Sequence, residues 1–147
     1  MSLTEEINAL ADLIRTAVPG AAVYLFQEPA LLAKGDFVIQ LKQENRSLES
    51  RSHTMVQRQY TITLFGEQMQ DAVLTMEQVS LHAMNSAPAA GSPSVPPSFA
   101  SFMYEPAGRT ENGLEKCAAT VQTEAREALA AVTYEKIKKM SIRTTLN

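Results

Sequence analysis

The fold is decided by residues 55–65, which read Met-Val-Gln-Arg-Gln-Tyr-Thr-Ile-Thr-Leu-Phe. Apolar and polar side chains alternate there with a period of two, which predicts a β-strand with one buried face. The apolar set is Tyr60, Ile62 and Leu64, and the polar set is Gln59, Thr61 and Thr63. Residues 37–42 repeat this alternation, so we expect a second strand with Phe37, Ile39 and Leu41 on one side.

A polar segment separates these two strands. Residues 43–54 carry both signs of charge and contain no Gly or Pro, so we expect a long projecting β-hairpin arm in place of a tight turn. Mixed charges at this spacing suit a contact with another copy of the same chain, and a solvated hairpin is the competing interpretation. The charged side chains in and beside the arm include Glu44, Arg46, Glu49, Arg51 and Arg58.

A helix is predicted before the strands. Ser2 and Glu5 have the spacing of a capping box, and Pro19-Gly20 ends the helical pattern. The buried face is expected to consist of Ile7, Leu10, Ala11, Ile14 and Val18, and the solvated residues to include Glu6, Asp12 and Arg15. Residues 22–26 then read as a short strand.

A second helix is predicted at residues 67–84, after Gly66. Leu74 and Leu81 widen its apolar stripe, so we expect much of this helix to be covered. Methionines at helical spacing are usual core residues, which we favour over a metal site. The stripe consists of Met69, Ala72, Val73, Met76, Val79 and Ala83.

The remainder of the chain alternates loops and extended segments. Residues 85–98 hold four of the seven prolines and predict a surface loop. A strand follows at 99–104, and residues 105–113 predict a loop that ends in an Asn112-Gly113 turn. Residues 114–140 fit either strand or helix, and we expect a strand at 114–124, a helix at 126–139 and an extended end at 140–146.

These elements predict a single α/β (α+β) domain over residues 1–147. We expect a small mixed or antiparallel sheet with helices packed on it, a projecting hairpin arm, and a C-terminal extension from about residue 126. A length of 147 residues suits one domain. The 45% hydrophobic and 20% charged content are typical of a folded chain.

The charge distribution is uneven. Residues 136–143 carry four basic side chains and no acid, which leaves nine basic against all sixteen acidic side chains up to Glu135, a balance of −7. An acidic body argues against a general nucleic-acid binder, and the basic end favours an acidic partner surface or is a solvated tail. We find no signal-peptide pattern at the N-terminus and no apolar run of membrane length.

The sequence predicts no catalytic site, cofactor or metal. Metal-ligand spacings and nucleotide-binding glycine motifs are absent from it. Cys117 is the single cysteine, and with His53 or His82 it would make a thiol nucleophile and base only if the fold joined them. A buried, unreactive Cys117 is the favoured interpretation.

The order of these elements resembles the tail terminator proteins of long-tailed bacteriophages. The segments that carry the resemblance are residues 14–24 (Ile-Arg-Thr-Ala-Val-Pro-Gly-Ala-Ala-Val-Tyr), 37–41 (Phe-Val-Ile-Gln-Leu) and 58–65 (Arg-Gln-Tyr-Thr-Ile-Thr-Leu-Phe) with the helix after them. The Asn112-Gly113 turn that leads to residues 118–121 is similar to the closing strands of this family. The resemblance covers residues 3–84, just over half of the chain.

The resemblance implies a structural role in the virion, at the head-proximal end of the tail, after assembly in the host bacterial cytoplasm. Its members form a ring, usually of six subunits, that caps the tail tube, stops its polymerisation and docks on the head connector. The expected partners are other copies of the chain, the tail tube protein and the head–tail connector or stopper. We expect no membrane contact and no sequence-specific nucleic-acid contact even where DNA passes through the ring. The expected subunit-interface residues are Arg46, Glu49, Arg51, Arg58, Lys138, Lys139 and Arg143.

Two other classes of function remain open. The first is another head–tail connector, neck or tail-completion component with a similar small domain. The second is a small oligomeric enzyme or ligand-binding protein, which the missing motifs disfavour.

Overall fold

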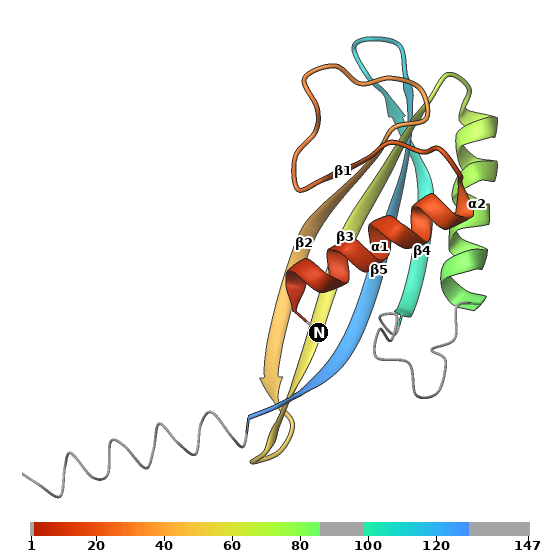
Figure 1. Cartoon of the computed structure of the whole chain (residues 1–147). Helices are drawn as coiled ribbons and strands as arrows, with labels where there is room; N and C mark the ends of the chain where they lie inside the picture. Colours follow the sequence, from red (N-terminus) through yellow and green to blue (C-terminus); the bar gives the residue numbers. More distant parts are fainter. Residues whose placement is uncertain (1, 86–98, 130–147) are drawn as a thin grey trace, which may run out of the picture.

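The computed structural model describes residues 2–85 and 99–129, which form a five-stranded sheet with two helices on one face (Figure 1). The strand order is β1-β2-β3-β5-β4, with β1 parallel to β2 and every other pair antiparallel. This mixed sheet with packed helices confirms the predicted fold class. The elements are α1 Leu3–Ala17, β1 Val23–Leu25, β2 Phe37–Leu48, β3 His53–Gly66, α2 Met69–Asn85, β4 Phe99–Arg109 and β5 Glu115–Ala128.

Helix α1 begins and ends where the sequence predicts. The amide of Glu5 donates to Ser2 Oγ at 3.2 Å, and the amide of Ser2 donates to Glu5 Oε2 at 3.1 Å. This capping box satisfies two amides that would otherwise lack partners at the helix start. Gly20 follows the helix with a φ of +83°, a conformation that L side chains rarely adopt.

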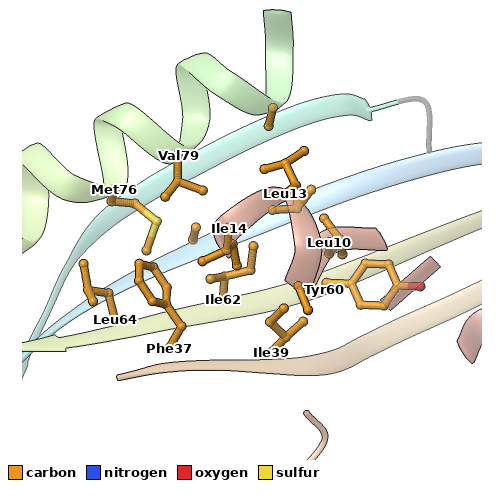
Figure 2. Close-up of a cluster of buried hydrophobic side chains, with 14 of the residues drawn as sticks. Leu10, Leu13, Ile14, Phe37, Ile39, Tyr60, Ile62, Leu64, Met76 and Val79 are labelled. Atoms are coloured by element: carbon orange, nitrogen blue, oxygen red, sulfur yellow. The ribbon is translucent and has the colours of Figure 1, made fainter. Parts of the chain in front are cut away.

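The core lies between the two helices and one face of the sheet (Figure 2). Burial of the predicted faces is confirmed, since Ile7, Leu10 and Ile14 of α1 are fully enclosed. Complete burial of such a side chain stabilises the fold by about 1.5–3 kcal/mol. The strand residues on the same face are Phe37, Ile39, Tyr60, Ile62, Leu64, Cys117, Ala119 and Val121, and Leu41 is partly buried against them.

The two long central strands build the hairpin arm. β2 and β3 stay paired from Phe37↔Leu64 to Leu48↔Thr54, well beyond the predicted ends at 42 and 55. The arm is therefore continuous sheet, and Figure 1 shows it extending past both helices.

Strand β5 corrects the prediction of a helix that begins at residue 126. β5 runs from Glu115 to Ala128, and residues 124–128 pair with residues 53–57 of β3. The Ala and Glu residues there favour a helix in isolation, but the extended β3 offers unpaired backbone groups that only a neighbouring strand satisfies. Residues 130–147, with the rest of that predicted helix and the predicted extended end, lie outside the described residues.

Strand β4 corrects the predicted loop at residues 105–113. β4 continues to Arg109, and a bulge between Pro106 and Gly108 absorbs the irregularity. Because β4 is an edge strand, the missing amide of Pro106 costs no central ladder bond. The Asn112-Gly113 turn is confirmed, with the Gly113 amide bonded to the Thr110 carbonyl at 3.0 Å. The predicted proline-rich loop lies outside the described residues except for Asn85, which ends α2.

Helix α2 packs with only part of its predicted stripe. Ala72, Met76, Val79 and Ala83 are buried, as expected. Leu74 and Leu81, predicted to widen the buried stripe, are instead 50% and 55% exposed. The outer face of α2 is therefore uncovered in the described chain, because the sheet and α1 contact the opposite side of this helix.

Candidate functional site: the charged hairpin arm

We define the hairpin arm as residues 43–58 of β2 and β3, which lie beside residues 122–128 of β5. At its tip, the amides of Glu49 and Ser50 both donate to the His53 carbonyl at 3.1 Å. The amide of Leu129 donates to the Ser52 carbonyl at 2.7 Å, so the chain after β5 leaves from the tip. The arm is thus a ribbon of three paired strands.

Arg58 lies at the base of the arm and is 1% exposed. Its Nε donates to Glu44 Oε1 at 2.6 Å, and its terminal nitrogens lie 3.4 Å from Glu6 Oε2 and 3.7 Å from Glu127 Oε1. A buried guanidinium without such partners would be strongly destabilising. Arg58 is therefore bound by carboxylates from α1, β2 and β5.

Glu6 corrects the prediction that it is solvated. The side chain is 1% exposed, and its Oε1 accepts hydrogen bonds from Tyr60 Oη at 2.8 Å and Thr123 Oγ1 at 2.6 Å. A sequence signal for this burial exists, because Glu6 precedes Leu10 by four residues and Leu13 by seven. That spacing places a carboxylate inside the apolar stripe of α1, where it needs polar partners.

A β-bulge explains why Glu44 faces Arg58. Leu41 pairs with Tyr60 and Glu44 with Arg58, so three steps on β2 match two on β3, with the irregularity between Leu41 and Gln43. In a strand with strict alternation, Glu44 would lie on the face of the sheet opposite to that of Leu41. The extra residue restores Glu44 and Arg46 to the helix-covered face, beyond the apolar core.

Arg46 extends this cluster toward solvent. Its Nη1 donates to Glu127 Oε2 at 2.7 Å, and its Nη2 lies 3.6 Å from Glu44 Oε1. The five charged side chains of this set form what we call the arm-base network, with three carboxylates and two guanidinium groups. Its members are Glu6, Glu44, Arg46, Arg58 and Glu127.

Pairing shifts the pKa values within the arm-base network. The hydrogen bond from Arg58 holds the pKa of the Glu44 carboxyl below its ordinary value, although desolvation opposes this shift. The hydrogen bond to Glu127 raises the pKa of Arg46. Burial lowers the pKa of Arg58, but the bond to Glu44 and the charge of Glu6 outweigh burial and raise it overall. Glu44, Arg46 and Arg58 therefore stay ionised at neutral pH.

Tyr60 joins the arm-base network to the apolar core. Burial, together with the hydrogen bond to Glu6, raises the pKa of the Tyr60 hydroxyl. The hydroxyl therefore stays protonated and remains a donor to Glu6. Its ring lies in the core beside Leu10 and Ile39 (Figure 2), so α1 is bound to the arm through both polar and apolar contacts.

The predicted interface residues have different surroundings. Arg58 is enclosed within its own chain, and Arg46 and Glu49 make intrachain ion pairs, the latter with Arg126 at 2.8 Å. Arg51 is exposed at the tip of the arm and makes no ion pair with the described residues. Lys138, Lys139 and Arg143 lie outside the described residues, so the interface assignment stays a prediction.

The arm also has two open backbone edges. Among the described residues, residues 43–48 of β2 pair only with β3, because the β1 ladder ends at Ile39. Within the same part of the chain, residues 124–128 of β5 pair only with β3, because the β4 ladder begins at Thr123. Within the described chain, both outer sides of the arm therefore present backbone groups that another strand can pair with.

Cys117 and His53 form no catalytic pair. Cys117 pairs with Leu64 and His53 pairs with Ala128, eleven residues apart along β3, or roughly 35 Å at strand spacing. Burial raises the pKa of the Cys117 thiol, which lowers the fraction of reactive thiolate at neutral pH. His53 Nδ1 lies 2.9 Å from Ser52 Oγ at the tip.

Further sites are limited in the part of the chain that the structure describes. There, no group of three His, Cys, Asp or Glu side chains could hold a metal ion. Neither of the two described helices has the length and hydropathy to cross a bilayer. An open cleft of about 400 Å³ lies between Lys34 and the start of α2, with Phe37 and Leu64 in its apolar lining and Glu67 and Asp71 among its polar residues.

Comparison with known proteins identifies the fold alone. No family model matches the sequence, and no curated protein does so either. Among solved structures, the chain is similar to one described as "Virion of native gene transfer agent (GTA) particle". The TM-score is 0.54 at 13% sequence identity, and the match covers 82% of this chain and 93% of that chain.

Proposed function

We propose that this protein is a structural component of a phage-like virion and acts as a tail terminator. In this role it forms a cyclic homo-oligomer, most simply a hexamer, at the head-proximal end of the tail tube. The ring stops tube polymerisation and joins the tail to the head connector. The observation that carries the proposal is the shared fold with a virion chain, over 93% of that chain's length.

The arm supports a role in assembly. Its two open edges belong to different strands, so the β2 edge of one copy faces the β5 edge of another only in a head-to-tail contact. Contacts of that kind generate closed rings when the rotation between subunits closes. The exposed Arg51 at the tip adds a charge that a neighbouring copy can pair with.

The surroundings of the reactive side chains also support a role by contact. Cys117 is buried in the core, and the carboxylates of the arm-base network neutralise arginines. Core packing accounts for the position of Cys117, and ion pairing accounts for the positions of the carboxylates. The proposed partners are accordingly macromolecules: other copies of this chain, the tail tube protein and the connector.

Native mass spectrometry of the full chain tests the proposal, alone and with the tail tube protein of the same virus. We expect a ring of about six subunits, and electron microscopy should show tubes that stop growing when the ring is added. A ring that binds the connector but leaves tube length unchanged would favour the neck component. A monomer in every mixture would contradict both.

The role of the arm has its own variant. Arg51→Glu reverses an exposed charge at the tip of the arm. It should weaken ring formation and change the dependence of ring formation on salt concentration. The control is Arg15→Glu on α1, which reverses an exposed charge away from the arm. Equal assembly of both variants would remove the arm tip from the interface. Reversal of Arg46 is unsuitable here because it would break the arm-base network.

A further inference from the structure

Helix α2 exposes an apolar stripe that the rest of the described chain leaves uncovered. Leu74, Leu81 and Met84 are 50%, 55% and 55% exposed. They are spaced at i, i+7 and i+10, which places them on one side of the helix. We call these three residues the α2 outer stripe.

Acidic residues surround the α2 outer stripe. Residues 67–85 contain Glu67, Asp71 and Glu77 and no Lys or Arg. Glu77 lies between Leu74 and Leu81 in sequence and is exposed. A ligand for this surface therefore needs apolar side chains flanked by positive charge.

The C-terminal segment of this chain has that composition. Residues 130–147 carry four basic side chains against the single acid Glu135. Tyr134, Ile137 and Met140 recur at every third position, and Lys136, Lys138 and Lys139 lie among them. The segment thus combines apolar side chains with lysines, and the lysines complement the acids around the stripe.

The point at which this segment begins favours a second copy as its binding site. Leu129 is bonded to Ser52 at the arm tip, and Figure 1 shows the tip lying well beyond the end of α2 in the same chain. The 18 residues after Leu129 therefore begin at the end of the arm, away from the α2 of their own chain.

We propose that the α2 outer stripe binds residues 130–147 of a second copy of this chain. Each subunit then donates its C-terminal segment and receives one on α2. This contact is head-to-tail, as a ring requires, and it rests on the proposed function because it gives that ring a second interface.

Disulfide trapping tests the contact directly. Leu81→Cys and Ile137→Cys are placed in two differently tagged chains that both carry Cys117→Ala, and the chains are co-expressed and oxidised with oxidised glutathione. We expect a cross-linked heterodimer as the major product. The control pair combines Ile137→Cys with Thr4→Cys, at an exposed position on α1, and should give little heterodimer.

A second measurement links the contact to assembly. Leu74→Gln with Leu81→Gln, both at exposed positions, should raise the Kd of self-association by at least about tenfold with the fold intact by circular dichroism. Deletion of residues 130–147 should have the same effect. The reversal Glu77→Lys should weaken assembly, and the triple change of Lys136, Lys138 and Lys139 to Glu should partly restore it.

The outcomes separate this inference from the proposed function. If the parent chain forms rings but no heterodimer is trapped, the inference is overturned and the proposed function stands. In a third chain that carries both Leu81→Cys and Ile137→Cys, a cross-link that forms only within that chain would show that the segment binds its own α2, and would overturn the exchange. If the parent chain stays monomeric with the tail tube protein and no heterodimer forms, both fail.

Discussion

Replacement of Glu6 by alanine tests the arm-base network. The change removes the acceptor of Tyr60 and Thr123 at 2.8 and 2.6 Å, and one of the charges that face Arg58. In the parent chain Arg58 is 1% exposed, and its nearest carboxylate, Glu44, is still present after the change. Loss of one partner of a buried ion pair costs about 3–5 kcal/mol. Alanine is the better helix former, so helix propensity does not contribute to this loss.

The measurement is urea unfolding followed by circular dichroism at one fixed protein concentration. With a urea m-value of about 1–3 kcal/mol/M, a loss of this size should lower the midpoint by roughly 1–5 M while the slope stays unchanged. The control is Asp12→Ala, which removes another carboxylate paired with an arginine on α1, but one that is 77% exposed. That change should cost less than about 1 kcal/mol.

Equal losses for Glu6→Ala and Asp12→Ala would refute the argument. A second variant separates the charge from the volume. Glu6→Leu together with Arg58→Met replaces the pair by apolar groups of similar size, and should recover part of the stability lost in Glu6→Leu alone. A double variant that loses the sum of the two single losses would show no coupling between them.

The remaining predictions concern the apolar core, the dependence of stability on pH, and the Cys117 thiol. Ile62→Ala should cost about 2–5 kcal/mol because Ile62 is fully buried, whereas Leu74→Ala at a half-exposed position should cost much less by the same urea titration. In the folded protein the pKa of Glu44 lies below its ordinary value of 4.5. The stability that Glu44 contributes is therefore present above pH 4.5 and is lost as the pH falls through the lower folded value. In Glu44→Gln, the unfolding midpoint should fall less steeply as the pH is lowered. Cys117 should react with a thiol reagent at pH 8 much more slowly in the folded protein than in urea. Cys117→Ala should leave assembly unchanged. A variant that keeps the fold but no longer assembles would contradict this prediction.

Local pattern was sufficient for most of the fold. The capping box at Ser2 and the alternation around Ile62 each depend on neighbours within a few residues, and both predictions are confirmed. The path of residues 126–128 depends instead on the length of β3, which lies some seventy residues earlier in the sequence. A helix-favouring composition was overridden there by a partner strand that local reasoning does not contain.

The sequence predicted the hairpin shape of the arm but not the ion pairs within it. The mixed charges predicted a contact between copies, which stays a prediction, but they did not indicate that Arg46, Glu49 and Arg58 form ion pairs within the chain. Two non-local facts account for these intrachain pairs. The bulge after Leu41 changes which face the β2 charges occupy, and Glu6 reaches Arg58 only because α1 packs across the strands.

The bulge between Leu41 and Gln43 has a geometric consequence. A bulge bends its strand and increases the local twist, and this one lies where the helix-covered sheet passes into the arm. Deletion of the extra residue, Lys42, would leave Glu44 opposite Arg58 but would straighten the ribbon at that point. The direction of the arm is thus separable from its chemistry. In a ring closed through such arms, that direction sets the rotation from one subunit to the next, and one inserted residue would help to determine how many subunits complete the circle.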